Sequence, residues 1–197
     1  MKKKSLAVAA IALLLAGTSM AEVVNFNEFT DSFQTTGGFT SGSLSFAPVS
    51  GIDVLGVWTT APDVGAFNGT PYLLDGFGDT FSVARTDAGV FTLDSFDAAL
   101  GWFQSHEDGA TISVTYDLAA GGQSTVVYTL GSGFATFAPG LEITQATFDL
   151  GGAGDGYISL DNIAVTSAVP EPGSSSLLLA GLGVIGLVQR RRARARA

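Results

Sequence analysis

The sequence of 197 residues contains no cysteine, which excludes disulfide bonds and a cysteine nucleophile. Basic side chains are almost as scarce in the middle of the chain, where Arg85 is the only one between residues 22 and 168. Without a lysine there, a Schiff-base enzyme is not supported. The single histidine, His106, lies in a polar string at residues 104–109, which is typical of a solvated hairpin turn. No G-x-S-x-G motif is present, so a nucleophilic hydrolase lacks its usual machinery.

The scarcity of basic residues leaves residues 22–168 strongly acidic. Every acidic residue of the chain except Glu171 falls in this region, so its net charge is −16, whereas that of the whole chain is −9. Such a charge repels nucleic acid and acidic polysaccharide unless divalent cations bridge them. We therefore expect no nucleic-acid partner, and we expect cations to relieve the self-repulsion of the folded chain.

The N-terminal 21 residues have the pattern of a secretory signal peptide. Residues 2–4 are lysines, and residues 6–16 form an apolar segment. Ser19 and Ala21 supply small side chains at positions −3 and −1, which predicts that signal peptidase cleaves between Ala21 and Glu22. The alternative is an uncleaved N-terminal anchor.

The C-terminal segment, residues 169–197, has three parts in a fixed order: a rigid spacer, an uncharged apolar run at residues 177–188, and a basic tail. The apolar run makes a helix of roughly 18 Å at about 1.5 Å per residue, which is short against a hydrocarbon core of about 30 Å. By the positive-inside rule the arginines stay cytoplasmic and the preceding domain is exported. The spacer consists of Val169, Pro170, Glu171 and Pro172, and the basic tail carries Arg190, Arg191, Arg192, Arg194 and Arg196.

This order of spacer, apolar run and arginine cluster resembles the PEP-CTERM sorting signal of Gram-negative bacteria. The resemblance implies that an exosortase-type membrane protease recognises the spacer. It also implies an inner-membrane intermediate, anchored by the C-terminal helix, on the way to the cell surface or the extracellular matrix. Without the spacer, an ordinary C-terminal membrane anchor would be preferred. The chain thus divides into a signal peptide (1–21), an exported domain (22–168) and a sorting tail (169–197).

The exported domain has the pattern of many short strands separated by Gly, Ser, Thr, Asn and Asp. The clearest strand is residues 111–118, where apolar and polar residues alternate, and no segment of the domain shows a convincing helical period. Antiparallel strands at roughly ten-residue spacing predict an all-β domain, a β-sandwich or jelly roll. The apolar phase slips near Asp94 and Ser95, which predicts a β-bulge or a bend there. It slips again between Leu160 and Ile163, which predicts a β-bulge at Asp161 and Asn162.

Residues 157–165, together with the block from residue 78 to residue 96, resemble the exported domains of many proteins with this sorting signal. Those domains are usually jelly rolls similar to carbohydrate-binding modules, in which calcium often lies between the first and last strands. By this analogy a Ca²⁺ site would bring together Glu28, Asp31 and Asp161. The alternative is that these three acids are solvated surface residues. The glycine-rich string at residues 151–156 occurs once and reads as a flexible turn rather than a calcium repeat.

Large aromatic residues are candidates for a carbohydrate platform, because their flat rings can stack on sugars. Trp58, Tyr72 and Trp102 are the candidates, although large aromatics in a small sandwich are more often part of the core.

A glycan hydrolase and an ice-binding protein are two further functional classes. A glycan hydrolase needs two carboxylates, such as Asp94 with Asp97, but so acidic a domain brings acids together by chance. Ice binding needs a flat, regular Thr-rich face, and the sequence contains no Thr-x-Thr array.

The function favoured by the sequence is that of a non-catalytic protein of the extracellular polysaccharide matrix, with weak carbohydrate binding. The alternative is a small secreted glycan hydrolase that uses two carboxylates.

We predict that the mature protein begins at Glu22 and lacks the apolar helix and the arginines, because both proteases act during export. Intact-mass analysis of the released protein measures this directly. Recovery of the complete Arg-rich terminus in the released form would contradict the prediction.

Overall fold

The computed structural model describes residues 19–50, 55–61, 65–76, 79–101, 110–149 and 157–168. The chain divides into two compact units, one of residues 20–167 and the other of residues 1–19 together with residues 168–197. The expected signal helix and the expected C-terminal transmembrane helix lie outside the described residues. Within the described ranges, no helix is long and apolar enough to cross a membrane.

The described residues form thirteen β-strands and no helix, as the alternating pattern predicts. The strands are β1 (Ser19–Val24), β2 (Phe33–Thr35), β3 (Phe39–Ser41), β4 (Leu44–Ser50), β5 (Leu55–Trp58), β6 (Tyr72–Gly76), β7 (Thr80–Arg85), β8 (Phe91–Leu100), β9 (Thr111–Leu118), β10 (Gln123–Thr129), β11 (Ala135–Phe137), β12 (Leu141–Asp149) and β13 (Tyr157–Ala168).

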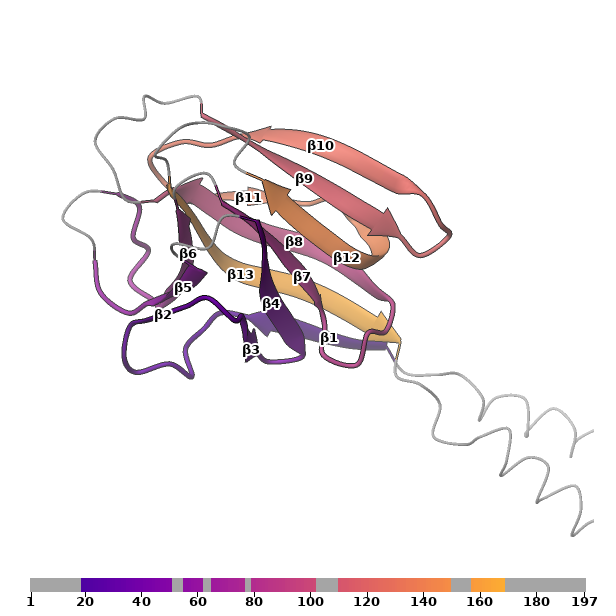
Figure 1. The fold of residues 1–197 in the computed structure, drawn as a ribbon, viewed down its shortest axis with the longest axis horizontal. Coiled ribbons are helices and arrows are strands. Elements are labelled where there is room, and N and C mark those ends of the chain that lie inside the picture. The colour runs from indigo at the N-terminus through magenta and orange to yellow at the C-terminus, as the bar shows by residue number, and fades with distance from the viewer. Residues whose placement is uncertain are drawn as a thin grey trace, which may run out of the picture. The chain divides into compact units, whose positions relative to one another are not determined.

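The strands pair into two antiparallel layers, which is the predicted β-sandwich (Figure 1). One layer, here called the β9 sheet, has the order β10-β9-β12-β7-β4-β3. The other, the β13 sheet, has the order β2-β5-β6-β13-β8, with β11 paired to β8 and β1 paired to β13. The fold class expected from the sequence is therefore confirmed.

Strand β12 joins the two layers. Its first residues, 141–143, pair with β8, and residues 145–149 pair with β7 on one edge and with β9 on the other. The register shifts between Ile143 and Gln145, so Thr144 is an extra residue. A bulge of this kind bends a strand, which lets β12 pass from one layer to the other.

Both predicted bulges are confirmed in the β13–β8 ladder. The register shifts between Asp161 and Ala164, where Asn162 has a φ of 48°. It shifts again between Ala164 and Val165, opposite Asp94. Without these shifts the apolar residues after Leu160 would point away from the core, because a one-residue slip reverses the face of every side chain that follows.

The core between the layers is rich in phenylalanine. Phe96 of β8 lies at its centre, fully buried, with its ring centroid 5.4 Å from that of Phe148, 5.5 Å from that of Tyr128 and 5.6 Å from that of Phe137. Two of these pairs, those with Tyr128 and Phe148, are edge-to-face, an arrangement that aromatic rings favour. The rings come from four strands of both layers and fasten the layers together.

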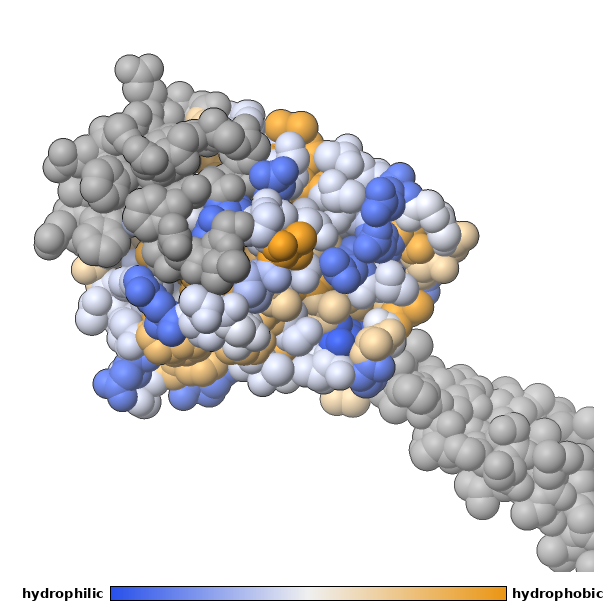
Figure 2. Space-filling view, in the orientation of Figure 1, coloured by the Kyte–Doolittle hydropathy of each residue, from blue (hydrophilic) through white to orange (hydrophobic). Residues whose placement is uncertain are grey.

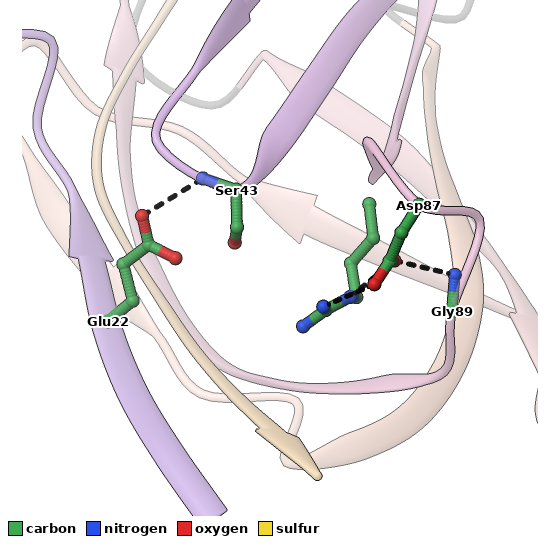
Figure 3. A network of polar contacts seen from close by, with 5 residues as sticks. Glu22, Ser43, Asp87 and Gly89 are labelled. Carbon is green, nitrogen blue, oxygen red and sulfur yellow. Dashed lines mark hydrogen bonds and ion pairs between the residues drawn. The ribbon is translucent and has the colours of Figure 1, made fainter. Parts of the chain in front are cut away.

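Three polar contacts hold two turns of the sandwich (Figure 3). Glu22 of β1 accepts a 3.0 Å hydrogen bond from the backbone amide of Ser43, between β3 and β4. Arg85 pairs with Asp87 at 2.7 Å, and the Asp87 carboxylate also accepts from the amide of Gly89. The one basic residue between residues 22 and 168 is thus engaged in a local turn.

The outward face of the β9 sheet is rich in hydroxyl groups. Ladder pairing places Ser82, Thr147, Thr115 and Thr125 in one row across four strands, and the Thr115 and Thr125 hydroxyls are 3.0 Å apart. The surface in view in Figure 2 is mostly pale or blue, with separate hydrophobic patches. This row runs across strands, so a search for Thr-x-Thr along one strand does not reveal it.

We predict that Phe96→Ala destabilises the domain by about 3–5 kcal/mol, because it removes the ring that both layers contact. Urea denaturation followed by tryptophan fluorescence measures the change in the free energy of unfolding. Val127→Ala is the control, since Val127 is 60% exposed on β10 and its truncation should change stability by less than about 0.5 kcal/mol. Equal effects of the two substitutions would contradict the assignment of Phe96 to the centre of the core.

Candidate ligand-binding face

A second, smaller aromatic cluster lies on the outward face of the β13 sheet. Neighbouring residues of a strand point to opposite faces, so Leu73 enters the main core whereas Tyr72 and Leu74 point outward. Tyr72 and Leu74 form this cluster with Tyr157, and the half-buried rings of Trp58 and Phe134 pack against it. This face therefore combines apolar rings with partial access to solvent.

The segment between β5 and β6 adds Phe67 to the cluster. The Phe67 ring lies 6.0 Å from the Tyr72 ring in an edge-to-face arrangement and remains 38% exposed. The preceding residue, Ala66, is buried, and its amide donates to the carbonyl of Leu100 at 3.3 Å. The segment is thus attached to the sheet and presents one aromatic ring to solvent.

Asp161 of β13 fixes the same segment. Its side chain is fully buried, and it accepts hydrogen bonds from Asn68 Nδ2 at 2.7 Å and from the amide of Asn162 at 2.8 Å. The hydroxyl of Thr70 lies 2.9 Å from the same carboxylate and 2.7 Å from Asn68 Oδ1. The Asn-Gly-Thr string is therefore a polar clamp that holds the Phe67 segment on the sheet.

A second carboxylate lies beside the clamp. Asp97 of β8 is the ladder partner of Asp161, and it accepts from Thr136 Oγ1 at 2.5 Å and from Asn162 Nδ2 at 2.9 Å. Burial raises the pKa of Asp161; the donors from Asn68, Asn162 and Thr70 lower it, and the charge of Asp97 raises it, with a net upward shift. Both carboxylates accept hydrogen bonds from the chain's own donors, which assigns them a structural role.

Two buried hydroxyls on this face have no hydrogen-bond partner among the described residues, those of Tyr72 and Ser159. Burial raises the pKa of Tyr72 to about 12, so the phenol stays protonated at physiological pH. Gly101 packs closely here, since a Cβ at this position would lie 2.7 Å from Leu74 Cδ1. Any larger residue in place of Gly101 would collide with Leu74, so the close packing on this face requires a glycine here.

The expected carbohydrate platform is only partly present. Trp58 is half-buried at the margin of the face, Tyr72 is fully buried, and Trp102 lies outside the described residues. The assignment of Tyr72 is corrected, because its ring is covered by Phe67 and Phe134 and offers no face to a ligand. Phe67 was not predicted, because an isolated phenylalanine in a Gly- and Asn-rich loop carries no strand pattern.

The expected calcium ligands do not come together, and this expectation is also corrected. Glu28 accepts a hydrogen bond from Ser41, Asp31 is exposed, and Asp161 is occupied by the clamp. In the part of the chain that the structure describes, no three His, Cys, Asp or Glu side chains group closely enough to hold a metal ion. Asn68 and the amide of Asn162 donate hydrogen bonds to Asp161, so its carboxylate is already satisfied without the calcium ion that the analogy assigned to it.

We predict that Asn68→Ala destabilises the domain by about 1–3 kcal/mol, because a buried carboxylate loses a donor. Asn68→Asp should be worse at neutral pH, because it sets a second carboxylate against Asp161. Both groups then have raised pKa values in the folded state, so the folded state binds more protons than the unfolded one. The lost stability should return as the pH falls toward 4. Thermal unfolding against pH measures this, with Asn27→Asp adding the same charge at an exposed position. A pH profile shared by both variants would contradict the clamp.

Comparison with known proteins agrees with the organisation of the chain. Residues 168–192 match the family model of the PEP-CTERM protein-sorting motif. No curated protein sequence matches the chain significantly. Similar solved structures include a variant of the family 29 carbohydrate-binding module CBM29-2, with 11% identity over 76% of this chain and 92% of that one and a TM-score of 0.42. Another is TmCBM61 in complex with β-1,4-galactotriose, with 12% identity over 62% and 86% of the two chains and a TM-score of 0.39.

The motif match concerns how the chain is handled during export, and it confirms the resemblance found in the sequence. The chain bears the PEP-CTERM signal of an exported, surface-sorted protein that is a substrate of exosortase-type processing.

Proposed function

We propose that this protein is a non-catalytic component of the extracellular polysaccharide matrix and binds neutral glycan weakly at the outward face of the β13 sheet. The observation that carries the proposal is the Phe67 ring, which is 38% exposed although its segment is clamped to the sheet through Asn68 and Asp161. An apolar ring held in place and open to solvent loses little conformational freedom when a ligand stacks on it.

The composition of the face supports a sugar as the ligand. Sugar rings have an apolar face that stacks on aromatic rings and a polar edge that forms hydrogen bonds. Phe67 and Trp58 offer the aromatic surface, and Asn68 and Thr136 are exposed polar residues beside it. The net charge of −16 on residues 22–168 repels anionic glycans and favours neutral ones.

Binding rather than hydrolysis is proposed because the carboxylates on this face are engaged. A glycosidase needs one carboxyl group to protonate the leaving group and another to act as base or nucleophile, both reaching the substrate. Asp161 is fully buried, Asp97 accepts from two side chains, and Asp94 accepts from Thr166 Oγ1 at 2.7 Å. The two-carboxylate mechanism weighed for the sequence therefore has no specific support from these acids.

The proposed route to the matrix follows from the two terminal segments. Signal peptidase and an exosortase-type protease are the proposed processing partners, and the apolar helix is the proposed membrane anchor of the intermediate before the second cleavage.

We predict that Phe67→Ala weakens binding to a neutral polysaccharide by about tenfold or more, with a smaller loss of stability than Phe96→Ala because the Phe67 ring is only partly buried. Affinity electrophoresis in gels containing the polysaccharide measures the dissociation constant. Phe67→Tyr should retain binding, because it keeps the ring, and Val127→Ala should retain it, because Val127 lies on the other sheet. Trp58→Ala should weaken binding and also lower stability, since its ring packs on the second cluster.

Release of reducing sugar is measured in parallel. We expect none above background. Sugar release that is abolished by substitution of one Asp or Glu, or full binding by the Phe67→Ala variant, would overturn the proposed function.

A further inference from the structure

Strand β6 places a carboxylate inside the apolar core. Asp75 shares a strand face with Leu73, a fully buried core residue, and is itself only 1% exposed. Its ladder partners on the two neighbouring strands are Leu55 of β5 and Ile158 of β13, both of which belong to the same core cluster. Directly paired residues share a face of the sheet, so the Asp75 side chain is flanked by apolar groups on both sides.

One oxygen of this carboxylate is not satisfied by the described residues. The backbone amide of Gly76 donates to the Asp75 carboxylate, but Oδ2 is buried without a hydrogen-bond partner in the described part of the chain. Arg85 cannot neutralise it, because that guanidinium is paired with Asp87. An ionised carboxylate in apolar surroundings is strongly destabilising unless a proton or a cation compensates it.

A second acid lies beside it. Asp79 is 7% exposed, its amide donates to the carbonyl of Gly76 at 3.2 Å, and its charge acts on Asp75, so the two acids lie close together. Burial first, and then the charge of Asp79, raise the pKa of Asp75 to about 8. Asp79 is the only charged group that acts on Asp75 among the described residues, since the partners on β5 and β13 are apolar.

We propose that Asp75 and Asp79 form a calcium-binding site at the end of β6. The unsatisfied Oδ2 of Asp75 is the anchoring ligand, Asp79 supplies the second carboxylate, and backbone carbonyls and water complete the coordination shell. The two negative charges match one divalent cation. Calcium suits an irregular set of oxygen ligands, whereas magnesium demands near-ideal octahedral geometry and gives up its water reluctantly.

The site couples stability to calcium, because a cation that binds the folded state and not the unfolded chain stabilises the fold. The site is independent of the proposed glycan binding, because Asp75 points into the core and the Phe67 cluster lies on the opposite face of the same sheet.

The test is thermal unfolding of the full-length chain in detergent, at pH 8, with CaCl₂, MgCl₂ or NaCl at matched ionic strength after treatment with a chelator. We expect calcium at about a hundredfold excess over its dissociation constant to raise the melting temperature by roughly 5–10 °C, and sodium to have little effect. Calorimetric titration with calcium alone measures the affinity, which we expect to fall in the range of about 10⁻⁴–10⁻³ M that is typical of extracellular modules.

Three variants identify the site. Asp75→Asn and Asp79→Asn should abolish the response to calcium, because each removes one of the two carboxylate ligands at nearly constant shape. Glu142→Gln is the control, since it removes one charge at an exposed position and should leave the response intact.

Two results would overturn the proposal. One is a melting temperature that responds equally to calcium and sodium. The other is a calcium response that persists in Asp75→Asn. If Asp79→Asn does not fold, Asp75→Asn and the titration still decide the question.

Discussion

The hydrogen-bonded position of β13 is the constraint on which both faces of its sheet depend. The strand is flanked by β6 and β8 and also pairs with β1, although it is the last strand of the domain. Its inward residues Ile158, Leu160 and Ile163 are buried in the core, and its outward Asp161 clamps the segment that carries Phe67. The bulge at Asn162 makes this combination possible, because it returns the apolar residues to the core after an outward-facing carboxylate.

The strongly acidic composition is accommodated in two ways, and one buried carboxylate is not fully satisfied by either. At the outward face, Asp161 and Asp97 accept hydrogen bonds from neutral amides and hydroxyls, which satisfy the oxygens without adding positive charge. In the turn after β7, Asp87 takes the single arginine between residues 22 and 168, and that salt bridge lowers its pKa. Asp75 receives only the backbone amide of Gly76, and its Oδ2 stays buried without a partner among the described residues. This difference is the reason that the cation proposal rests on it rather than on the more accessible acids.

The sequence was sufficient to predict the architecture but not the contacts between distant segments. Strand β9 and the bulges of β13 and β8 followed from alternation and its interruptions, which are properties of neighbouring residues. The clamp joins Asn68 to Asp161 across 93 positions of the chain, and the Thr row runs across four strands, so neither has a local signature. Tyr72 and Glu28 were misassigned for the same reason. Residue type suggested Tyr72 as a ring for sugar, and analogy with carbohydrate-binding modules suggested Glu28 as a ligand for calcium. The burial of Tyr72 by Phe67 and the hydrogen bond from Ser41 to Glu28 are tertiary contacts, which have no signature in the sequence.

The place of β13 in the sheet also relates the fold to the sorting signal. The strand ends at Ala168, where the match to the sorting motif begins. Because β6, β8 and β1 all take hydrogen bonds from β13, the β13 sheet is incomplete until the residues beside the motif are in place. A central strand contributed by the last part of a chain makes early folding unfavourable, since its partners would expose unpaired edges and core residues such as Leu73 and Phe96. The sandwich can therefore close only when its last strand, β13, pairs with the strands that precede it in the sequence. The segment that determines sorting follows this strand directly.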